Sequence, residues 1–364
     1  KPADLLSRPV RDLDPSPVEY ALSSGHVFIT GAGGTIGSEL ARQCLDLGAG
    51  RMTLFEGSEY NLYSVELELL ERSPKFPVTA QLGDVRDATL LKTTMMRARP
   101  EMVIHAAALK HVPLMEQNPC EAILTNIGGA LNSIDAALAS GVKRFVFIST
   151  DKAVDPDNVM GATKRLAELA IAYRANGQNI SVSMVRFGNV LGSSGSVVPL
   201  FERQILSGGP VTLTHDEVTR YFMTVEEAAG LVLQASAQDQ TVGQAGLYVL
   251  DMGEPIQIKA LAEAMVRMKG MVPGLDIHIE TTGLRPGEKL HETLTYPDER
   301  LEETGVEGLR VVIPEERRQE PDGFWSLLET LLNQARERDR SAALKTLSAL
   351  VPAYQPNKDK HSER

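Results

Sequence analysis

The chain has 364 residues, 43% of them hydrophobic and 23% charged, with a formal net charge of −11. This composition supports a sizeable core, and we expect one large domain and one smaller one. The negative charge argues against nucleic acid or anionic lipid as the main partner, although a local basic pocket for a phosphorylated ligand remains compatible with it. Two cysteines, Cys44 and Cys120, show no framework spacing, so we expect a reducing, cytoplasmic compartment and no metal site.

The two ends of the chain differ in composition from its middle. Residues 1–24 are polar and contain prolines, and we expect an N-terminal linker cut away from an upstream segment. Residues 351–364 are polar and charged, and we expect a flexible tail. No apolar run approaches the roughly 18 residues of a membrane span, so we expect no membrane contact by these residues themselves.

Strand-like runs alternate with helical periodicity through the first half of the chain. The strand candidates are 26–30, 52–55, 77–80, 101–105, 144–148 and 180–185. This alternation is typical of βαβ units, so we predict a Rossmann-type, doubly wound parallel α/β sheet over residues 25–190. Glycine- and serine-rich loops and shorter elements follow. We expect residues 191–350 to form mainly a smaller C-terminal α/β substrate-binding lobe, with a strand near 246–250 returning to the sheet.

A glycine-rich turn lies between the first strand and the first helical pattern. Strand, turn and helix in this order predict a dinucleotide site with the pyrophosphate at the helix N-terminus. We expect Gly31 to permit the tight turn, Gly34 to let the backbone approach the pyrophosphate, and Gly37 to allow close helix packing. The residues expected to bind the cofactor here are Gly31, Gly33, Gly34, Thr35, Ile36 and Gly37.

The next three strands end in further cofactor candidates. Glu56 lies about twenty residues past the glycines, where a carboxylate accepts hydrogen bonds from both ribose hydroxyls and repels a 2′-phosphate, so NAD is favoured over NADP. Asp84 and Val85 follow the third strand and are expected near the adenine amine, although a simple Asp turn explains Asp84 equally well. Small residues that would let the nicotinamide ribose lie close end the fourth strand: Ala106, Ala107 and Ala108.

Asp151 and Lys152 directly follow the apolar run 145–148, which predicts a buried strand. Ligands of an open parallel sheet bind beyond the carboxyl ends of its strands, so we expect this pair to face a substrate. Taken alone, the pair is better explained as a helix N-cap and a solvated lysine. The other motifs of the chain favour the functional interpretation.

The helix predicted after this strand has two distinct faces. At about 100° per residue, Met160 and Lys164 lie about 40° apart, and an apolar group lies roughly 150° away from them. We expect the first face to meet the cofactor. The second face either joins the core or pairs with a second subunit, and it consists of Leu166, Leu169, Ala170 and Tyr173.

A set of motifs along roughly residues 25–310 resembles one enzyme family. The motifs are Gly31-x-x-Gly34-x-x-Gly37, Asp84-Val85, His105-Ala106-Ala107, Leu109-Lys110-His111-Val112-Pro113, Asn126, Ser149-Thr150-Asp151-Lys152-Ala153-Val154, Asn158-Val159-Met160-Gly161-Ala162-Thr163-Lys164-Arg165, Arg186-Phe187-Gly188-Asn189-Val190 and Arg285-Pro286-Gly287-Glu288-Lys289. The chain resembles the extended short-chain dehydrogenase/reductases, and within them the nucleotide-sugar 4,6-dehydratases. It is most similar to the bacterial membrane-associated UDP-N-acetylglucosamine 4,6-dehydratases of polysaccharide and glycan biosynthesis.

The resemblance implies a cofactor, a substrate and a location. NAD is implied as a cofactor that Asn126 and Lys164 also help to hold, and a UDP-sugar is implied as the substrate. Family members carry transmembrane helices ahead of the catalytic part, so the full-length chain would be anchored at the cytoplasmic face of the inner membrane. We also expect a homo-oligomer, at least a dimer.

One position departs from the wider family. Other members place a tyrosine four residues before the lysine as the base for the sugar hydroxyl, whereas Met160 stands here, and a thioether does not usefully accept that proton. The membrane-associated dehydratases share this methionine. The change therefore agrees with that subgroup and leaves the identity of the first base open.

The resemblance implies oxidation at carbon 4 of the hexose, elimination of water across carbons 5 and 6, and hydride return to carbon 6. We assign Lys152 to the carbon 5 proton and Asp151 to protonation of the departing carbon 6 hydroxyl. Thr150 would bind the carbon 4 hydroxyl and need a relay, and Lys164 would bind the nicotinamide ribose. A neighbouring Asp and Lys prefer the ion pair, which is the wrong protonation state for this assignment.

Further side chains are expected to bind the nucleotide sugar. Arg285 offers a bidentate fork to the phosphates, and Glu288 can accept from the uridine ribose. Lys110 and His111 are expected to line the sugar pocket. Other candidates for substrate contacts are Asn189, Arg203 and Arg220, although a surface ion pair explains Arg220 about as well.

Two other functions fit parts of this sequence. A nucleotide-sugar 4-epimerase shares the oxidation step but needs no acid and base at carbons 5 and 6, so the pair Asp151-Lys152 argues against it. A nonenzymatic NAD-binding sensor or scaffold is supported by Met160 in place of tyrosine. The charged pair and the Arg285 loop argue against that second alternative.

Overall fold

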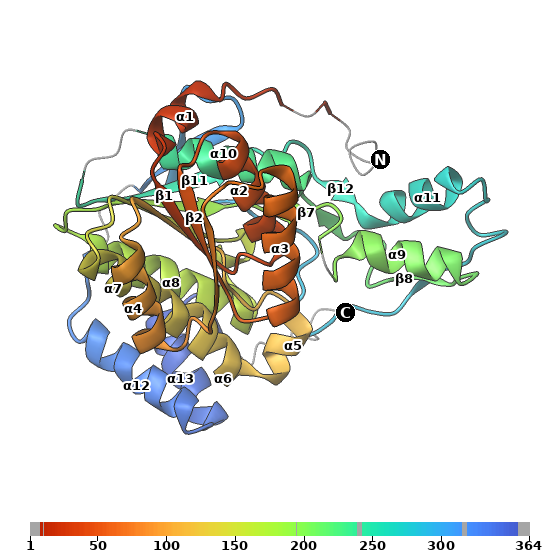
Figure 1. Cartoon of the computed structure of the whole chain (residues 1–364). Helices are drawn as coiled ribbons and strands as arrows, with labels where there is room; N and C mark the ends of the chain where they lie inside the picture. Colours follow the sequence, from red (N-terminus) through yellow and green to blue (C-terminus); the bar gives the residue numbers. More distant parts are fainter. Residues whose placement is uncertain (1–7, 10, 194, 239–241, 315–318, 356–364) are drawn as a thin grey trace.

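The computed structural model describes residues 8–9, 11–193, 195–238, 242–314 and 319–355. Its centre is a nine-stranded sheet in the order β14-β15-β11-β6-β5-β4-β1-β2-β3 (Figure 1). The strands from β3 to β11 are parallel, whereas β15 and β14 are antiparallel to their neighbours. The strands are β1 (His26–Thr30), β2 (Arg51–Glu56), β3 (Val78–Leu82), β4 (Met102–His105), β5 (Arg144–Ile148), β6 (Ser181–Arg186), β11 (Ala245–Leu250), β14 (Glu299–Glu303) and β15 (Leu309–Pro314). This topology confirms the predicted Rossmann-type fold.

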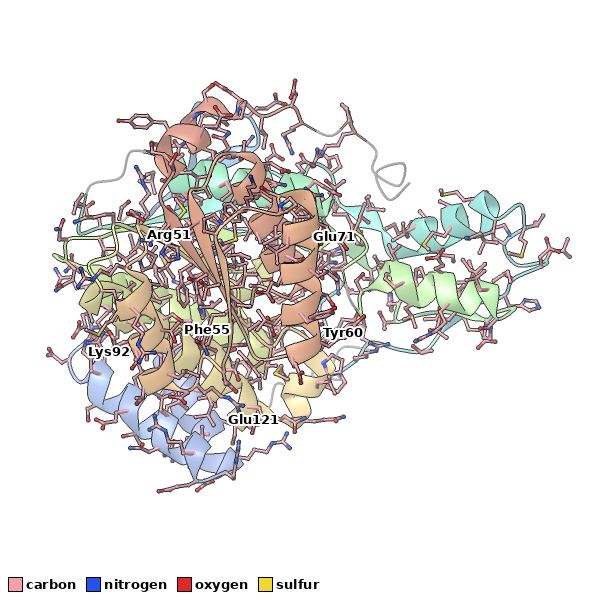
Figure 2. All side chains as sticks on the ribbon, in the orientation of Figure 1. Arg51, Phe55, Tyr60, Glu71, Lys92 and Glu121 are labelled. Atoms are coloured by element: carbon pink, nitrogen blue, oxygen red, sulfur yellow. The ribbon has the colours of Figure 1, made fainter. Side chains whose placement is uncertain are left out.

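Helices cover both faces of the sheet, which is why β1 is buried along its whole length. On one face α2 packs against α3 and α10, and on the other α7 packs against α4 and α8. Side chains fill the space between sheet and helices, with the ring of Phe55 stacked 5.9 Å from that of Phe28 (Figure 2). The helices are α2 (Thr35–Asp46), α3 (Glu59–Arg72), α4 (Ala88–Ala98), α5 (Val112–Gln117), α6 (Pro119–Ala122), the π-helix Ile123–Gly128, α7 (Gly129–Ala139), α8 (Val159–Ala175) and α10 (Val225–Ala237).

A small lobe projects from one side of the sheet (Figure 1). Its own apolar core joins Phe201 and Ile205 to Leu261 and Val266. The elements of this lobe are α9 (Val197–Leu206), α11 (Ile258–Met268), β8 (Val211–Leu213), β9 (Thr219–Arg220), β12 (Ile256–Gln257) and β13 (Ile279–Thr281). Two short strands at its base, β7 (Asn189–Val190) and β10 (Phe222–Met223), pair in parallel.

The expected block 191–350 is divided in the structure, because parts of it pack against the sheet domain. Strand β11 pairs in parallel with β6, and α10 packs against α2. The helices α12 (Phe324–Arg336) and α13 (Arg340–Leu350) pack against each other and against α6, the π-helix and α8. Local sequence pattern carries no information on which lobe these segments join.

The C-terminal helices also decide what covers the apolar face of α8. Leu166 and Ala170 lie in one buried cluster with Leu328, Leu331 and Leu347. Tyr173 meets the ring of Phe324 edge-on at 5.0 Å. This face therefore joins the core of the same chain.

Parts of the expected N-terminal linker and of the expected flexible tail pack against the sheet domain. In the lead-in, α1 (Ser16–Leu22) buries Val18 against α10. Arg8 and Arg11 form ion pairs of 2.8 and 2.7 Å with Glu227 of α10. Beyond α13, Val351 and Tyr354 are buried in the cluster with α8, while residues 356–364 of the expected tail lie outside the described residues.

A buried ionic network ties the carboxyl ends of β5 and β6 to α8 and β14. Arg186 has no exposed surface, and its guanidinium donates to both oxygens of Glu168 at 2.8 and 2.7 Å and to Glu299 at 2.7 Å. Arg165 donates to Glu168 at 2.8 Å, and Ser149 Oγ donates to it at 2.6 Å. Burial by itself would raise the pKa of Glu168, but its two arginine partners and Ser149 outweigh that effect and lower the pKa to about 2.

Among the described residues, no helix combines the length and the apolar character needed to cross a membrane.

The packing of α12 gives a direct stability test. Leu331 has no exposed surface, whereas Leu327 on the same helix is 37% exposed. We expect Leu331→Ala to lower the free energy of unfolding by about 2–5 kcal/mol, because it leaves a cavity in the buried cluster that α12 shares with α8. The control Leu327→Ala should cost less than about 1 kcal/mol. Equal losses in urea unfolding would contradict a core role for α12.

The network predicts a pH-dependent stability. Glu168→Gln should cost about 3–5 kcal/mol at neutral pH, because it leaves buried arginines without their carboxylate. Since folding lowers the pKa of Glu168 from 4.5 to about 2, its stabilisation is present above pH 4.5 and is lost as the pH falls toward 2. The difference in unfolding free energy between Glu168→Gln and wild type, measured by urea unfolding, should therefore become smaller between pH 4.5 and about pH 2.

The control for this experiment is Glu303→Gln on β14. Glu303 is 73% exposed and pairs with Arg310 at 3.2 Å. We expect this variant to lose less than about 1 kcal/mol. A difference between Glu168→Gln and wild type that stays constant from pH 7 to pH 2 would refute the argument.

Candidate active site

A cavity of about 500 Å³ lies beyond the carboxyl ends of the parallel strands, between the sheet domain and the small lobe. This is the edge where ligands of open α/β sheets bind. Most of the residues selected from the sequence lie in its wall. They are Gly34, Thr35, Ile36, Gly37, Ala106, Ala108, Lys110, His111, Thr150, Lys152, Met160, Lys164, Asn189, Arg220, Arg285 and Glu288.

The remaining selected residues lie outside that wall. They are Gly31, Gly33, Glu56, Asp84, Val85, Ala107, Asn126, Asp151 and Arg203. Asn126 and Asp151 lie behind wall residues and contact them.

The glycine turn and Glu56 lie side by side next to the cavity. Gly31 has φ +66°, and a Cβ at Gly37 would lie 2.0 Å from the Gly31 carbonyl oxygen, so α2 approaches β1 as closely as glycine permits. The Glu56 carboxylate accepts from Gly33 N and Ser58 N, both at 3.0 Å. The amino end of α2 therefore opens onto the cavity with a carboxylate beside the turn.

Two cofactor candidates and one substrate candidate have other surroundings. Asp84 accepts from the Arg86 side chain, and these hydrogen bonds lower the pKa of Asp84. Val85 is buried, and a Cβ at Gly129 would lie 2.6 Å from it. Arg203 lies outside the cavity wall: α9 buries its Phe201 side, and Arg203 lies two residues away on the exposed side of the helix.

Asn126 lies behind the wall in the π-helix and holds the loop after β4. Its side chain accepts from Leu109 N at 2.8 Å and donates to Leu109 O at 3.0 Å. It also donates to Thr163 Oγ1 at 3.0 Å, which links this loop to α8. Asn126 thus fixes the position of the wall residues that follow Leu109.

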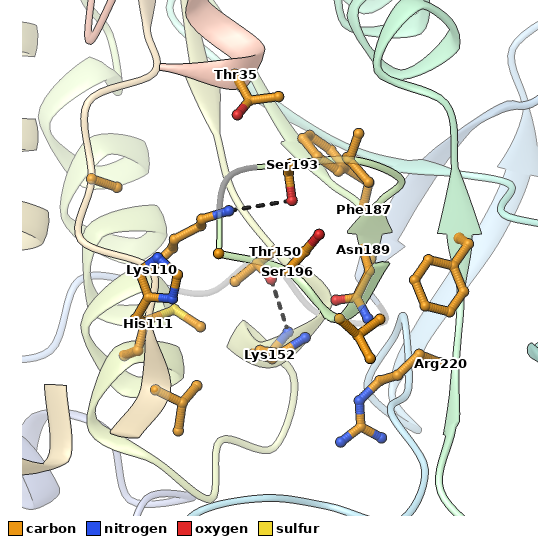
Figure 3. Close-up of a pocket in the computed structure, with 18 of the residues that line it drawn as sticks. Thr35, Lys110, His111, Thr150, Lys152, Phe187, Asn189, Ser193, Ser196 and Arg220 are labelled. Atoms are coloured by element: carbon orange, nitrogen blue, oxygen red, sulfur yellow. Dashed lines mark hydrogen bonds between the residues drawn. The ribbon is translucent and has the colours of Figure 1, made fainter. Parts of the chain in front are cut away.

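The Asp151-Lys152 pair lies at the end of β5, where the backbone of Asp151 donates to Phe187 O at 3.0 Å. Asp151 Oδ1 accepts from Thr150 Oγ1 at 2.9 Å and from Lys152 Nζ at 3.0 Å. Thr150 and Lys152 point into the cavity (Figure 3), while the carboxylate behind them is 1% exposed. A Cβ at Gly161 would lie 2.1 Å from Lys152 O, so only glycine lets α8 come this close.

Lys152 lies between two carboxylates. Glu292 of the small lobe places Oε1 3.7 Å from Lys152 Nζ. Burial by itself lowers the pKa of Lys152, but Asp151 and Glu292 outweigh both it and the opposing charge of Arg220, so the pKa is raised. Without a ligand the group is therefore an ammonium.

Lys164 has the opposite environment. Its side chain is buried. Its Nζ donates to Ile148 O and lies 4.1 Å from the centre of the Phe147 ring. Burial lowers its pKa to about 7, despite the opposing effect of Glu168. Met160, one turn earlier on α8, is 4% exposed and lies in the cavity wall beside it.

The side of the cavity that faces α5 is formed by Lys110 and His111 (Figure 3). Lys110 Nζ donates to Ser193 Oγ at 3.3 Å, and a Cβ at Gly195 would lie 2.4 Å from the His111 ring. Burial lowers the pKa of Lys110. Ser193 and Gly195, which follow β7, thus lie against these two side chains.

The opposite side carries Asn189 and Arg220 (Figure 3). Arg285 also lines the cavity. Arg220 is 8% exposed and donates to the carbonyl oxygens of Lys289 and Leu290 at 2.8 and 3.1 Å. It also pairs with Glu288 at 3.4 Å, so its ion pair lies inside the site and not on the open surface. Glu288 accepts from Thr214 Oγ1 at 2.8 Å and from Arg285 N at 3.2 Å.

Sequence reasoning missed Glu292 and the carboxylate Glu168 behind Ser149. Glu292 is separated from Lys152 by 140 positions, and no local pattern marks it. Glu168 lies four residues after Lys164, and its i+4 spacing could have placed it on the same side of α8.

Comparison with known proteins places the chain in a single family. Residues 27–314 match the family described as polysaccharide biosynthesis protein. The capsular polysaccharide biosynthesis protein CapD of Staphylococcus aureus is 47% identical over 81% of this chain and 49% of its own length. This chain thus spans about half the length of that relative.

Two shorter relatives are covered over most of their length. A UDP-N-acetylglucosamine 4,6-dehydratase (inverting) of Campylobacter jejuni is 36% identical over 75% of this chain and 78% of its own. A UDP-glucose 4-epimerase of Rickettsia typhi is 34% identical over the same shares.

Among solved structures, Pen from Bacillus thuringiensis has a TM-score of 0.72 and 34% identity, covering 80% of this chain and 89% of that one. Family match, relatives and fold agree with one another. The chain therefore belongs to the polysaccharide biosynthesis protein family and, as its motifs predicted, to the extended short-chain dehydrogenase/reductases.

Proposed function

We propose that this chain catalyses the NAD-dependent dehydration of a UDP-N-acetylhexosamine, with UDP-N-acetylglucosamine as the first candidate, to a UDP-4-keto-6-deoxy sugar. The observation that carries the proposal is the Thr150-Asp151-Lys152 group, which combines a hydroxyl, a carboxylate and an amine at the cavity wall. An epimerase shares the oxidation at carbon 4 but needs no base for carbon 5 and no acid for carbon 6. The name of the Campylobacter relative supports the same substrate.

The glycine turn and its neighbours suit NAD. The amino end of α2 would hold the pyrophosphate, and Glu56 would accept from the adenosine ribose and repel a 2′-phosphate. Ala106 and Lys164 line the cavity where the nicotinamide ribose would lie. When bound, NAD would supply a hydride acceptor and later a hydride donor. Lys164, with a pKa of about 7, would bind the ribose hydroxyls without a strongly held positive charge.

The small lobe would bind the nucleotide half of the substrate. Arg285 lines the cavity and would pair with the phosphates, and Glu288 would accept from the uridine ribose. Lys110 and His111 would contact the hexose. The resemblance to membrane-associated dehydratases supports two further proposals: the whole protein is anchored at the cytoplasmic face of the inner membrane, and it forms a homo-oligomer.

Thr150, Asp151 and Lys152 would each carry out a different proton transfer. Thr150 would accept the carbon 4 hydroxyl proton and pass its own to Asp151, which provides the relay that Met160 cannot. Lys152 would remove the carbon 5 proton, and Asp151 would protonate the hydroxyl that leaves carbon 6. The net product is the substrate minus water.

Incubation with UDP-N-acetylglucosamine and NAD tests the reaction. We expect mass spectrometry to show loss of one water from the sugar, and Asp151→Asn to reduce that product by about 100-fold or more. A product of unchanged mass with altered sugar stereochemistry would identify an epimerase. Bound NAD without turnover of any UDP-sugar would identify a sensor.

The role of Lys152 has a separate test in deuterated water. We expect Lys152→Ala to oxidise the sugar and accumulate NADH, because the Thr150 relay is intact. Deuterium should then fail to enter carbon 5 of the recovered sugar, since its base is missing. An undiminished rate of deuterium entry would show that Lys152 is not this base.

A further inference from the structure

Two groups in the cavity wall can exchange protons with a sugar, and each has a buried carboxylate behind it. Thr150 donates to Asp151 Oδ1 over 2.9 Å, and Lys152 Nζ lies 3.7 Å from Glu292 Oε1. The side chains of Asp151 and Glu292 are 1% and 4% exposed. Neither carboxylate reaches the cavity except through the group in front of it.

Resting on the proposed dehydration, we propose that Glu292 is a positioning residue that takes the ammonium proton of Lys152 once Asp151 is protonated, so that Lys152 acts on carbon 5 as an amine. An adjacent Asp and Lys by themselves form an ion pair, in which the lysine is protonated and cannot act as the base of the elimination. A third ionisable group removes this difficulty.

The charges around Lys152 change during the reaction. At rest, Asp151 and Glu292 stabilise the ammonium, and Arg220 is the opposing charge. Oxidation at carbon 4 sends the hydroxyl proton through Thr150 to Asp151 and neutralises one of the two carboxylates. Because burial disfavours charged groups, the remaining Lys152-Glu292 pair can then exist as amine and carboxylic acid.

The protons and electrons balance over the cycle. In the elimination Lys152 takes the carbon 5 proton, the electron pair of that bond forms the C5–C6 double bond, and the C6–O bond breaks. Asp151 returns its proton through Thr150 to the departing hydroxyl, which leaves as water. As hydride returns to carbon 6, Lys152 gives its proton to carbon 5, and Glu292 restores the ammonium.

The lobe segment that carries Glu292 is fixed on the loop that carries Lys152. Asn158 Nδ2 donates to Gly287 O at 3.0 Å before Glu292, and Tyr296 OH donates to Ala153 O at 3.0 Å after it. Lys289 Nζ donates to Val154 O at 3.3 Å. These contacts on both sides hold the Glu292 carboxylate beside Lys152 Nζ.

The test uses the full chain with NAD and UDP-N-acetylglucosamine in deuterated water, with NADH absorbance, deuterium at carbon 5 and product mass as readouts. We expect Glu292→Gln to keep NADH formation within about threefold of wild type, and to lower both deuterium entry and dehydration by about 100-fold or more. Glu292→Asp, which keeps the carboxyl group, should restore at least a tenth of the lost rate. The exposed Glu280→Gln of the same lobe is the matched control and should match wild type.

The readouts separate the two proposals. Deuterium entry at the wild-type rate in Glu292→Gln overturns the role of Glu292 and leaves the dehydration intact. Equal loss of NADH formation and deuterium entry also overturns it, because that pattern reports a structural role. Failure of wild type to dehydrate any UDP-sugar refutes the proposed function itself.

Discussion

The ion pair between Arg186 and Glu168 is the constraint on which the geometry of the cavity depends. A guanidinium with no exposed surface is stable only beside carboxylates, so Arg186 forces Glu168 of α8 and Glu299 of β14 to its two sides. Ser149 donates to the same Glu168 carboxylate. The residues that follow Ser149, those that follow Arg186, and the α8 face that carries Lys164 therefore share one fixed anchor.

The pKa values of the two lysines that this anchor positions are shifted in opposite directions, although burial lowers both. Lys164 is surrounded by a carbonyl oxygen and a phenyl ring, so desolvation dominates and its pKa falls to about 7. Lys152 is close to two carboxylates, which outweigh desolvation and keep it charged. One cavity thus holds an amine that is readily neutral and an ammonium whose charge depends on its neighbours. A change in the protonation of Asp151 acts directly on Lys152, whose Nζ lies 3.0 Å from the Asp151 carboxylate.

The sequence pattern predicted those features that depend on residues close together in the chain. It did not predict contacts between segments that are distant in the chain. The strands β1, β2, β4, β5 and β6 follow from apolar runs that are largely buried between the helices on both faces, whereas β3 is a partly exposed strand at the edge of the sheet. The glycine turn follows from the close approach of Gly37 to Gly31. Asp151 and Lys152 were predictable because the end of a parallel strand is a ligand site. Glu292, which arrives from another lobe, carries no local signal. The position of Arg203 on the exposed side of α9 could not be predicted, because one exposed helix face looks like another in a sequence.

The sequence also did not show that the C-terminal helices α12 and α13, which form a helical hairpin, pack near α8. This hairpin restricts how copies of the chain can associate. The apolar face of α8 could have met a second subunit, yet Leu331 and Leu347 of α12 and α13 cover Leu166 and Ala170. A second copy could reach that face only if the hairpin left, which would expose the whole cluster to water at roughly 25 cal/mol for each Å². The proposed homo-oligomer must therefore use other surfaces, and the helix that carries Met160 and Lys164 is supported from within its own chain.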